Sequence, residues 1–267
     1  MAELNLSNFI IDRILSGVGY GTDGAVYFKM DQCQDTSITC GSEATEIVDN
    51  VGAPVMTLYR AKTCEISGQN AILDMNLTAF QMGTTKTVAN STDKIVAPAV
   101  EVFAVKKDET THKLANTPVA APAFIYALND DSSLGEKYVL STDAASATEF
   151  TCANGVITLP TGITEGTEIF VSYEYEAASG IEIVNSAKNF PKSCKLVLKA
   201  LGYNPCEKDN KLACYVIFPS FEMSPDFDLS LQAGETQAWS GKASQDYCSK
   251  DKRLMSIVVV DEDDEMF

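Results

Sequence analysis

The stretch that decides the fold is Val55-Met56-Thr57-Leu58-Tyr59-Arg60, followed two residues later by Thr63-Cys64-Glu65-Ile66-Ser67. Apolar and polar side chains alternate along much of both segments, and a period of two residues is typical of a strand with one buried face. Both segments are therefore predicted strands. Similar short apolar segments, separated by Gly, Pro, Asn and Asp, recur along most of the chain, which predicts a mainly β fold.

The strand pattern divides the chain into three parts, residues 1–96, 97–176 and 177–267. The first and third parts share one style of strand, so we expect them to form a discontinuous β-barrel or sandwich core. The middle part carries shorter strands separated by turn residues, which predicts a small immunoglobulin-like β-sandwich insertion. Apolar residues between Ala71 and Met82 recur near helical spacing, which predicts one helix packed on the core.

The third part holds two further strand predictions. Asp226–Leu231 alternates polar and apolar residues, and Leu254–Val260 is a nearly continuous apolar run. Such a run is typical of a strand buried on both faces. The acidic residues that follow, from Asp261 to Glu265, are expected to end the sheet and to lie in solvent.

Composition excludes several classes of protein. The 267 residues are 45% hydrophobic and 21% charged, which is too apolar for a disordered chain. The net charge of -17 argues against a nucleic-acid binder, since neutralising phosphates requires clustered Lys and Arg. The apolar runs are shorter than the ~20 residues of a membrane helix, and Met1–Asn5 does not resemble a signal peptide. We therefore expect folding in the cytosol, with no membrane partner.

The metal-ligating residue types do not form a recognisable site. The eight cysteines include no Cys-x-x-Cys pair, and His112 is the sole histidine, so we expect no metal and no cofactor. The polar neighbours of His112 predict a solvated turn. The cysteines are expected to be reduced thiols, several of them buried. Cys206 and Cys214 flank a polar loop and could bridge if oxidised; whether any cysteines pair stays open.

Motifs for catalysis are equally sparse, and the chain is predicted not to be an enzyme. The sequence lacks the Gly-x-Ser-x-Gly, Gly-Lys-Ser/Thr and His-Glu-x-x-His patterns. The glycine-dense stretch Gly17–Gly24 precedes a predicted strand, whereas a phosphate loop follows one. We interpret it as a turn or a subunit-contact loop. Asp226 and Asp228 would share a strand face, and a solvated acidic pair is favoured over the carboxylate pair of a glycosidase.

Both ends of the chain resemble the major tail tube proteins of tailed bacteriophages, in versions with an immunoglobulin-like insertion. The resemblance covers most of the first and third parts. It consists of a pattern of strand segments and includes no catalytic motif. The residues that carry it are Asn8–Ile14, Ala25–Gln32, Asp35–Thr39, Glu43–Asp49, Tyr59–Ala71, Phe218–Asp228 and Gln245–Tyr247.

The resemblance implies a structural virion protein, made in the cytoplasm of a host bacterium, that forms hexameric rings stacked into a hollow tail tube. Its partners would be copies of itself and other phage tail proteins, and DNA would pass through the acidic tube without specific binding. Contacts between copies would come from the loops Gly17–Gly24 and Glu43–Pro54 and from the strand Leu254–Val260. The residues proposed for assembly are Gly17, Gly19, Gly21, Gly24, Glu43, Asp49, Leu254, Ile257 and Val259.

Three other functions fit parts of this pattern. A capsid decoration protein or a tail terminator would be a different virion component. A cell-surface adhesion module would account for the small sandwich, although the start of the chain argues against export. A carbohydrate-active enzyme would use Asp226 and Asp228 as its acidic pair.

Overall fold

The structure is a computed structural model and describes residues 8–230, 232–247 and 249–261. Three sequence-based expectations lie outside the described residues: the start of the chain at Met1–Asn5, the thiol of Cys248, and the acidic run beyond Asp261. Over the described ranges the fold is mainly β with one short helix, as predicted.

Contacts divide the chain into two compact units. Unit 1 combines the residues up to Lys86 with those from Ile183 onward, and unit 2 is Thr87–Glu182. These limits enclose the predicted insertion of residues 97–176, because the long strand β6 (Ile95–Ala104) of unit 2 begins before residue 97. The two-stranded ladder between β5 (Thr87–Val88) and β13 (Ile181–Glu182) also belongs to unit 2.

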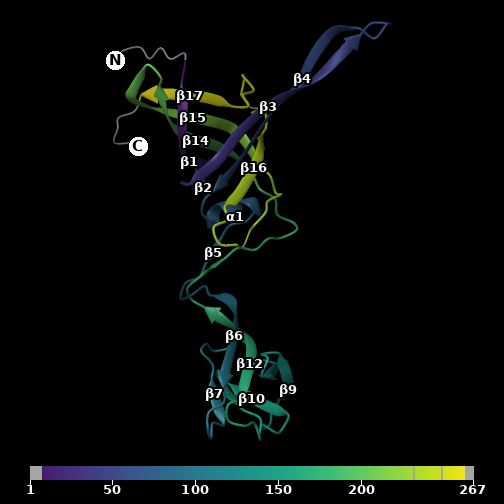
Figure 1. Ribbon diagram of the computed structural model, residues 1–267, viewed down its shortest axis with the longest axis vertical. Helices are drawn as coiled ribbons and strands as arrows, with labels where there is room; N and C mark the ends of the chain where they lie inside the picture. Colours follow the sequence, from purple (N-terminus) through teal and green to yellow (C-terminus); the bar gives the residue numbers. More distant parts are fainter. Residues whose placement is uncertain (1–7, 231, 248, 262–267) are drawn as a thin grey trace. The chain divides into compact units, whose positions relative to one another are not determined.

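Unit 1 is built on one curled sheet that forms a half-barrel (Figure 1). Among the described residues this sheet has eight strands, in the order β2-β1-β14-β15-β16-β4-β3, with β17 also paired to β15. The strands of unit 1 are β1 (Ile10–Tyr20), β2 (Val26–Met30), β3 (Cys33–Val48), β4 (Pro54–Asn70), β14 (Ser193–Asn204), β15 (Glu207–Met223), β16 (Gln237–Ala243) and β17 (Ser256–Asp261). Neighbours in this sheet are antiparallel throughout.

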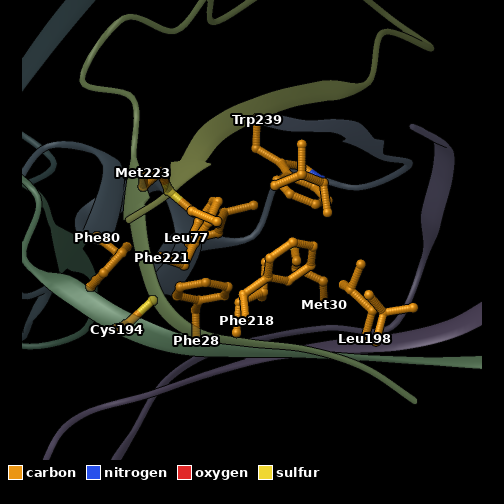
Figure 2. Packing of buried hydrophobic residues seen from close by; sticks show 14 of the residues in the cluster. Phe28, Met30, Leu77, Phe80, Cys194, Leu198, Phe218, Phe221, Met223 and Trp239 are labelled. Atoms are coloured by element: carbon orange, nitrogen blue, oxygen red, sulfur yellow. The ribbon is translucent and has the colours of Figure 1, made fainter. Parts of the chain in front are cut away.

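The core of unit 1 lies on the concave side of this sheet and is rich in aromatic rings (Figure 2). Phe28, Phe218 and Phe221 are almost completely buried. The rings of Phe218 and Phe221 are 6.3 Å apart, and Trp239 packs in the same cluster. Burial of such rings is a dominant favourable term in folding, so this cluster specifies how the sheet curls.

The helix α1 (Met75–Gln81) is shorter than the predicted segment Ala71–Met82. It begins after Asp74, whose Oδ1 accepts a hydrogen bond from the backbone N–H of Leu77 at 2.7 Å and so caps the helix. Buried Gln237 of β16 ties the helix to the sheet, since its amide nitrogen donates to Thr78 Oγ1 and to Gln81 Oε1, each at 3.0 Å. The buried polar groups on this side of the helix are thereby satisfied.

Unit 2 has its own sheet and its own core. Its strands are β5 (Thr87–Val88), β6 (Ile95–Ala104), β7 (Thr111–Lys113), β8 (Phe124–Leu128), β9 (Leu134–Leu140), β10 (Glu149–Ala153), β11 (Val156–Thr158), β12 (Glu168–Ala177) and β13 (Ile181–Glu182). Seven of these follow one another in the order β6-β12-β8-β9-β10-β11-β7. Ile125, Phe150, Ile157 and Ile169 are completely buried in the core of the unit.

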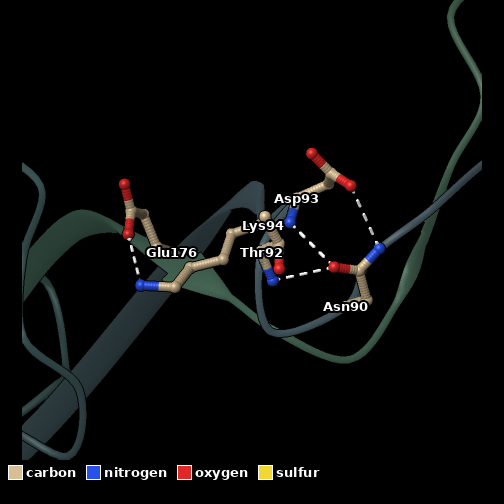
Figure 3. Close-up of polar contacts among 5 residues, drawn as sticks. All are labelled: Asn90, Thr92, Asp93, Lys94 and Glu176. Atoms are coloured by element: carbon tan, nitrogen blue, oxygen red, sulfur yellow. Dashed lines mark hydrogen bonds and ion pairs between the residues drawn. The ribbon is translucent and has the colours of Figure 1, made fainter.

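The chain enters β6 through a turn fixed by polar side chains (Figure 3). Asn90 Oδ1 accepts hydrogen bonds from the backbone N–H groups of Thr92 and Asp93, each at 2.8 Å. Lys94 then pairs with Glu176 at 2.7 Å across the ends of β6 and β12. This ion pair is exposed and contributes little stability, whereas the Asn90 bonds fix where the strand begins.

Several predicted strands differ from the structure. The predicted strands Val55–Arg60 and Thr63–Ser67 are one strand, β4, which pairs with the similarly long β3. A shift in the ladder between Gly41 and Glu43, opposite a positive φ of 48° at Ala61, lets pairing continue through the break in the pattern. The strand predicted at Asp226–Leu231 is wrong for residues 226–230, which are irregular.

Candidate assembly surface

The largest projection of unit 1 is a two-stranded arm, which we define as residues 41–63. In it β3 and β4 pair with each other from Gly41 and Thr63 to Val48 and Pro54. The neighbouring strand β16 pairs with β4 only up to Glu65, so the described part of the chain gives the arm no third strand. Figure 1 shows the arm extending beyond the rest of the sheet. An isolated two-stranded ribbon has little stability in water without a partner.

The arm exposes large apolar side chains on both of its faces. Every residue from Gly41 to Thr63 is exposed except Thr57 and Leu58, which are half-buried. Val51 is 84% exposed and Tyr59 is 72% exposed, and the other exposed apolar residues of the arm are Ile47, Val48, Val55 and Met56. Apolar groups gathered on a projecting ribbon mark a surface that another protein covers.

The tip of the arm is held in a defined turn by Asp49. Its Oδ1 accepts hydrogen bonds from the backbone N–H groups of Val51 at 2.9 Å and Ala53 at 2.8 Å. Gly52 has a φ of 85°, a conformation that glycine adopts without strain. The predicted loop Glu43–Pro54 is therefore wrong as a loop: Glu43 lies in β3 opposite Arg60, and only the tip around Asp49 is a turn.

The strand β17 forms a second exposed apolar surface of unit 1. It pairs with β15 along one side, and within the described residues its other side has no ladder. Ile257 is 59% exposed and Val258 is 41% exposed. Leu254 and Val259 pack against the core. The prediction of a strand buried on both faces is thus wrong, because the sheet forks at β15, which pairs with β17 along Leu212–Ile217 and with β16 along Phe221–Met223.

The glycine-dense stretch is only partly the turn that the sequence predicted. Gly17 and Gly19 lie in β1 and are buried, whereas the turn runs from Gly21 to Ala25, with Gly21 donating to the carbonyl of Ala25 at 2.7 Å. Gly24, with a φ of 84°, lies at the exposed end of this turn. Gly17 and Gly19 leave room for large side chains of β2, which pack over β1. They do not form a loop.

Gly19 shows why a side chain larger than hydrogen does not fit in this part of β1. It lies directly opposite Phe28 of β2, and a Cβ atom added to Gly19 would meet Phe28 Cε1 at 2.4 Å. At Gly17 an added Cβ would meet Met30 Cε at 2.7 Å. These glycines therefore serve the packing of the core.

The remaining candidates for catalysis or metal binding do not come together in one site. The prediction of a solvated turn for His112 is wrong: His112 lies in β7, and its ring stacks on Phe103 with centroids 3.5 Å apart. Its Nδ1 lies 3.3 Å from Glu109 Oε1. The carboxylate of Glu109 accepts a hydrogen bond from the Lys106 N–H, which together with the contact to His112 lowers the Glu109 pKa. This cluster braces a turn of unit 2.

Asp226 and Asp228 are both exposed and lie on an irregular segment. With Asp35 and Trp239 they line an open hollow of about 320 Å³. Within the described residues, no three His, Cys, Asp or Glu side chains gather in a way that would hold a metal ion. Cys206 is exposed and Cys214 is buried in β15, and both are free thiols.

Comparison with known protein families identifies the family to which a chain with this arm and this exposed strand β17 belongs. The family model described as the YomU/Tube protein family matches residues 19–253. The chain belongs to the YomU/Tube protein family. The match spans the arm, all of unit 2 and the core strands from β2 to β16. No curated protein matches the chain.

As a member of the YomU/Tube family, the chain is a phage tube-type structural protein. The family places it in the virion tail, where it assembles with other phage tail components, and indicates a structural role rather than an enzymatic one. No helix in the described ranges is long and apolar enough to cross a membrane.

Sequence reasoning missed most of the apolar residues that this YomU/Tube protein exposes. Of the residues predicted for assembly, Glu43 and Asp49 lie in the arm, whereas the exposed Val51, Val55 and Tyr59 are not among the predicted residues. A signal was present: apolar pairs such as Ile47-Val48 and Val55-Met56 place one apolar side chain on each face of a strand. Such pairs predict a ribbon with apolar side chains on both faces.

Proposed function

We propose that this protein is a major tail tube subunit that forms hexameric rings, and that the rings stack into a tube through which phage DNA passes. The single observation that carries the proposal is the arm, a free-standing ribbon with exposed apolar residues on both faces. Because the tube family implies self-assembly, we propose another copy of this chain as the partner of the arm. The arm would lie against the sheet of a neighbouring copy.

Free sheet edges support a closed ring. The strands β2, β3 and β17 each have a ladder partner along one side in the described part of the chain. Unpaired edges invite uncontrolled association, and a closed ring of copies removes them. Cyclic symmetry lets one surface serve every contact around the ring. Ile257 and Val258, exposed on β17, would become buried in such a contact.

The net charge of -17 supports a conduit for DNA. A lumen lined by carboxylates repels phosphates, so DNA would move past the wall without being bound. For the same reason we propose that the protein has no nucleic-acid site. The structural role of the family supports the further proposal that it catalyses no reaction. We also propose that unit 2 is an immunoglobulin-like insertion that decorates the tube and takes no part in its wall.

Electron microscopy of the purified full chain in negative stain tests the proposed function. At high protein concentration we expect rings with sixfold symmetry and tubes made of stacked rings. Because the contacts would be largely apolar, the tubes should persist in high salt. A strictly monomeric dispersion under all conditions, or rings with another symmetry, would contradict the proposal.

Removal of unit 2 is predicted to leave a folded protein that still assembles. In the β5–β13 ladder, Thr87 pairs with Glu182, and paired residues of an antiparallel ladder have Cα atoms about 4.5–5.5 Å apart. A short Gly-Ser linker from Lys86 to Ile183 therefore spans the gap. Analytical ultracentrifugation and negative-stain images should show soluble protein and tubes. Insoluble protein or a loss of tubes would show that unit 2 is part of the core or of the tube wall.

A further inference from the structure

Two cysteines face each other at the base of the arm. Cys40 of β3 and Cys64 of β4 are direct partners in the antiparallel ladder, and their Sγ atoms are 3.0 Å apart. Cys40 is exposed, whereas Cys64 is only 2% exposed. Met255, just before β17, brings its Sδ to 3.7 Å from Cys64 Sγ. Both thiols are free in this structure.

The pair stands at the border between the packed sheet and the arm. On one side of it, Cys64 and Ile66 are buried in the core of unit 1. On the other side, Gly41 and Thr63 begin the exposed ribbon, and the ladder shifts between Gly41 and Glu43. Ladder shifts are places where a strand bends and twists. A covalent bond at this position would fix the point from which the arm projects.

We propose that Cys40 and Cys64 are an oxidation site, at which a disulfide-type oxidant such as oxidised glutathione links β3 to β4 and clasps the base of the arm. Directly opposed residues in an antiparallel ladder have Cα atoms about 4.5–5.5 Å apart, and disulfides span about 4.4–6.8 Å. Closing the bond to about 2.05 Å moves the sulfur atoms by only about 1 Å from their present 3.0 Å. Side-chain rotation suffices for this movement.

The reaction proceeds in two exchange steps. The thiolate of exposed Cys40 attacks one sulfur of oxidised glutathione, which forms a mixed disulfide and releases one glutathione thiolate. The thiolate of Cys64 then attacks Cys40 Sγ, which forms the protein disulfide and releases the second glutathione thiolate. The two protons from the cysteines end on the two released thiolates, so the protein loses two electrons and oxidised glutathione gains them.

The second step controls the rate of the reaction. Burial raises the pKa of Cys64 to about 12, and the neighbouring Cys40 adds to this effect. Few Cys64 side chains are thiolates at neutral pH, so formation of the protein disulfide should accelerate as the pH rises. The cytosol keeps thiols reduced, whereas disulfides persist outside the cell. A virion released into the medium meets the conditions that favour the clasp.

The test uses the full chain and oxidised glutathione at mildly alkaline pH. After incubation, free thiols are alkylated and the digested protein is analysed by mass spectrometry. We expect a loss of two free thiols per chain and a peptide pair linked through Cys40 and Cys64. Cys206→Ser, which removes another exposed thiol, should give the same link. Cys40→Ser should lose the link, and its circular dichroism should match that of the unmodified chain.

Hydrogen exchange provides a second measurement on the same samples. In the oxidised protein, the amides of residues 41–63 should exchange more slowly, because the clasp opposes separation of the two strands. Oxidised glutathione should not slow exchange in Cys40→Ser. Cys40 found only as a mixed disulfide with glutathione, a link from either cysteine to another site, or a link between two chains would overturn the proposal. Unchanged exchange in the linked protein would overturn the clasp.

Discussion

Replacing residues 42–62 with an Asn-Gly turn will leave unit 1 folded and abolish the formation of tubes. The turn would join Gly41 to Thr63, which are already paired in the ladder, and Asn-Gly is the preferred loop of a two-residue hairpin. Nearly all of the deleted side chains are exposed, so the core loses no packing. The apolar surface of the arm, which we assign to contacts between copies, is removed. Negative-stain images should show dispersed subunits at concentrations where the full chain forms tubes.

A pair of charge substitutions makes the same test without shortening the chain. Val51→Glu with Val55→Glu keeps the arm but places two carboxylates on its apolar surface, so tubes should again be lost. Val100→Glu with Val102→Glu is the matched control, since these valines are 62% and 52% exposed on β6 of unit 2. The control should still form tubes. If the arm variants form tubes as readily as the full chain, the arm takes no part in assembly.

Gly19→Val will destabilise unit 1 by about 1–3 kcal/mol, the usual cost of overpacking a core. The added Cβ would lie 2.4 Å from Phe28 Cε1, and Phe28 itself packs on Phe80 with ring centroids 5.0 Å apart. Neither ring can move away without displacing the helix α1, to which Phe80 belongs. The expected result is therefore a loss of folding stability that precedes any effect on assembly.

Gly41→Val is the control for this substitution. Gly41 also lies in a strand, but it is exposed, and an added Cβ would have only Thr63 Oγ1 nearby, at 3.2 Å. Chemical unfolding followed by the fluorescence of Trp239, which is buried in the core of unit 1, should show a lower midpoint for Gly19→Val and little change for Gly41→Val. An unchanged midpoint for Gly19→Val would mean that the glycine is not required by packing.

The candidate assembly surface was only partly predictable from the sequence. Of the residues first assigned to it, Asp49, Gly24 and Ile257 are exposed, but Gly17 and Gly19 are buried in β1. Their spacing predicts a flexible loop, because a glycine in the sequence does not indicate which side chain packs over it. The ring of Phe28 decides the role of Gly19, and the side chain of Met30 decides that of Gly17; each lies opposite its glycine in the β1–β2 ladder. The prediction that Leu254–Val260 is buried on both faces is wrong for a similar reason, since apolar content alone does not distinguish a central strand from an exposed edge.

A mainly β chain with one helix within residues 71–82 is predictable from the sequence, because side-chain period and turn residues are local properties. The tertiary structure alone decided that residues 41–63 form an arm, because exposure depends on which strands pair beside it, and β16 stops at Glu65. It also decided that Cys40 and Cys64, 24 residues apart in sequence, have sulfur atoms within 3.0 Å. Ladder register sets such distances, and register follows from the packing of the whole sheet.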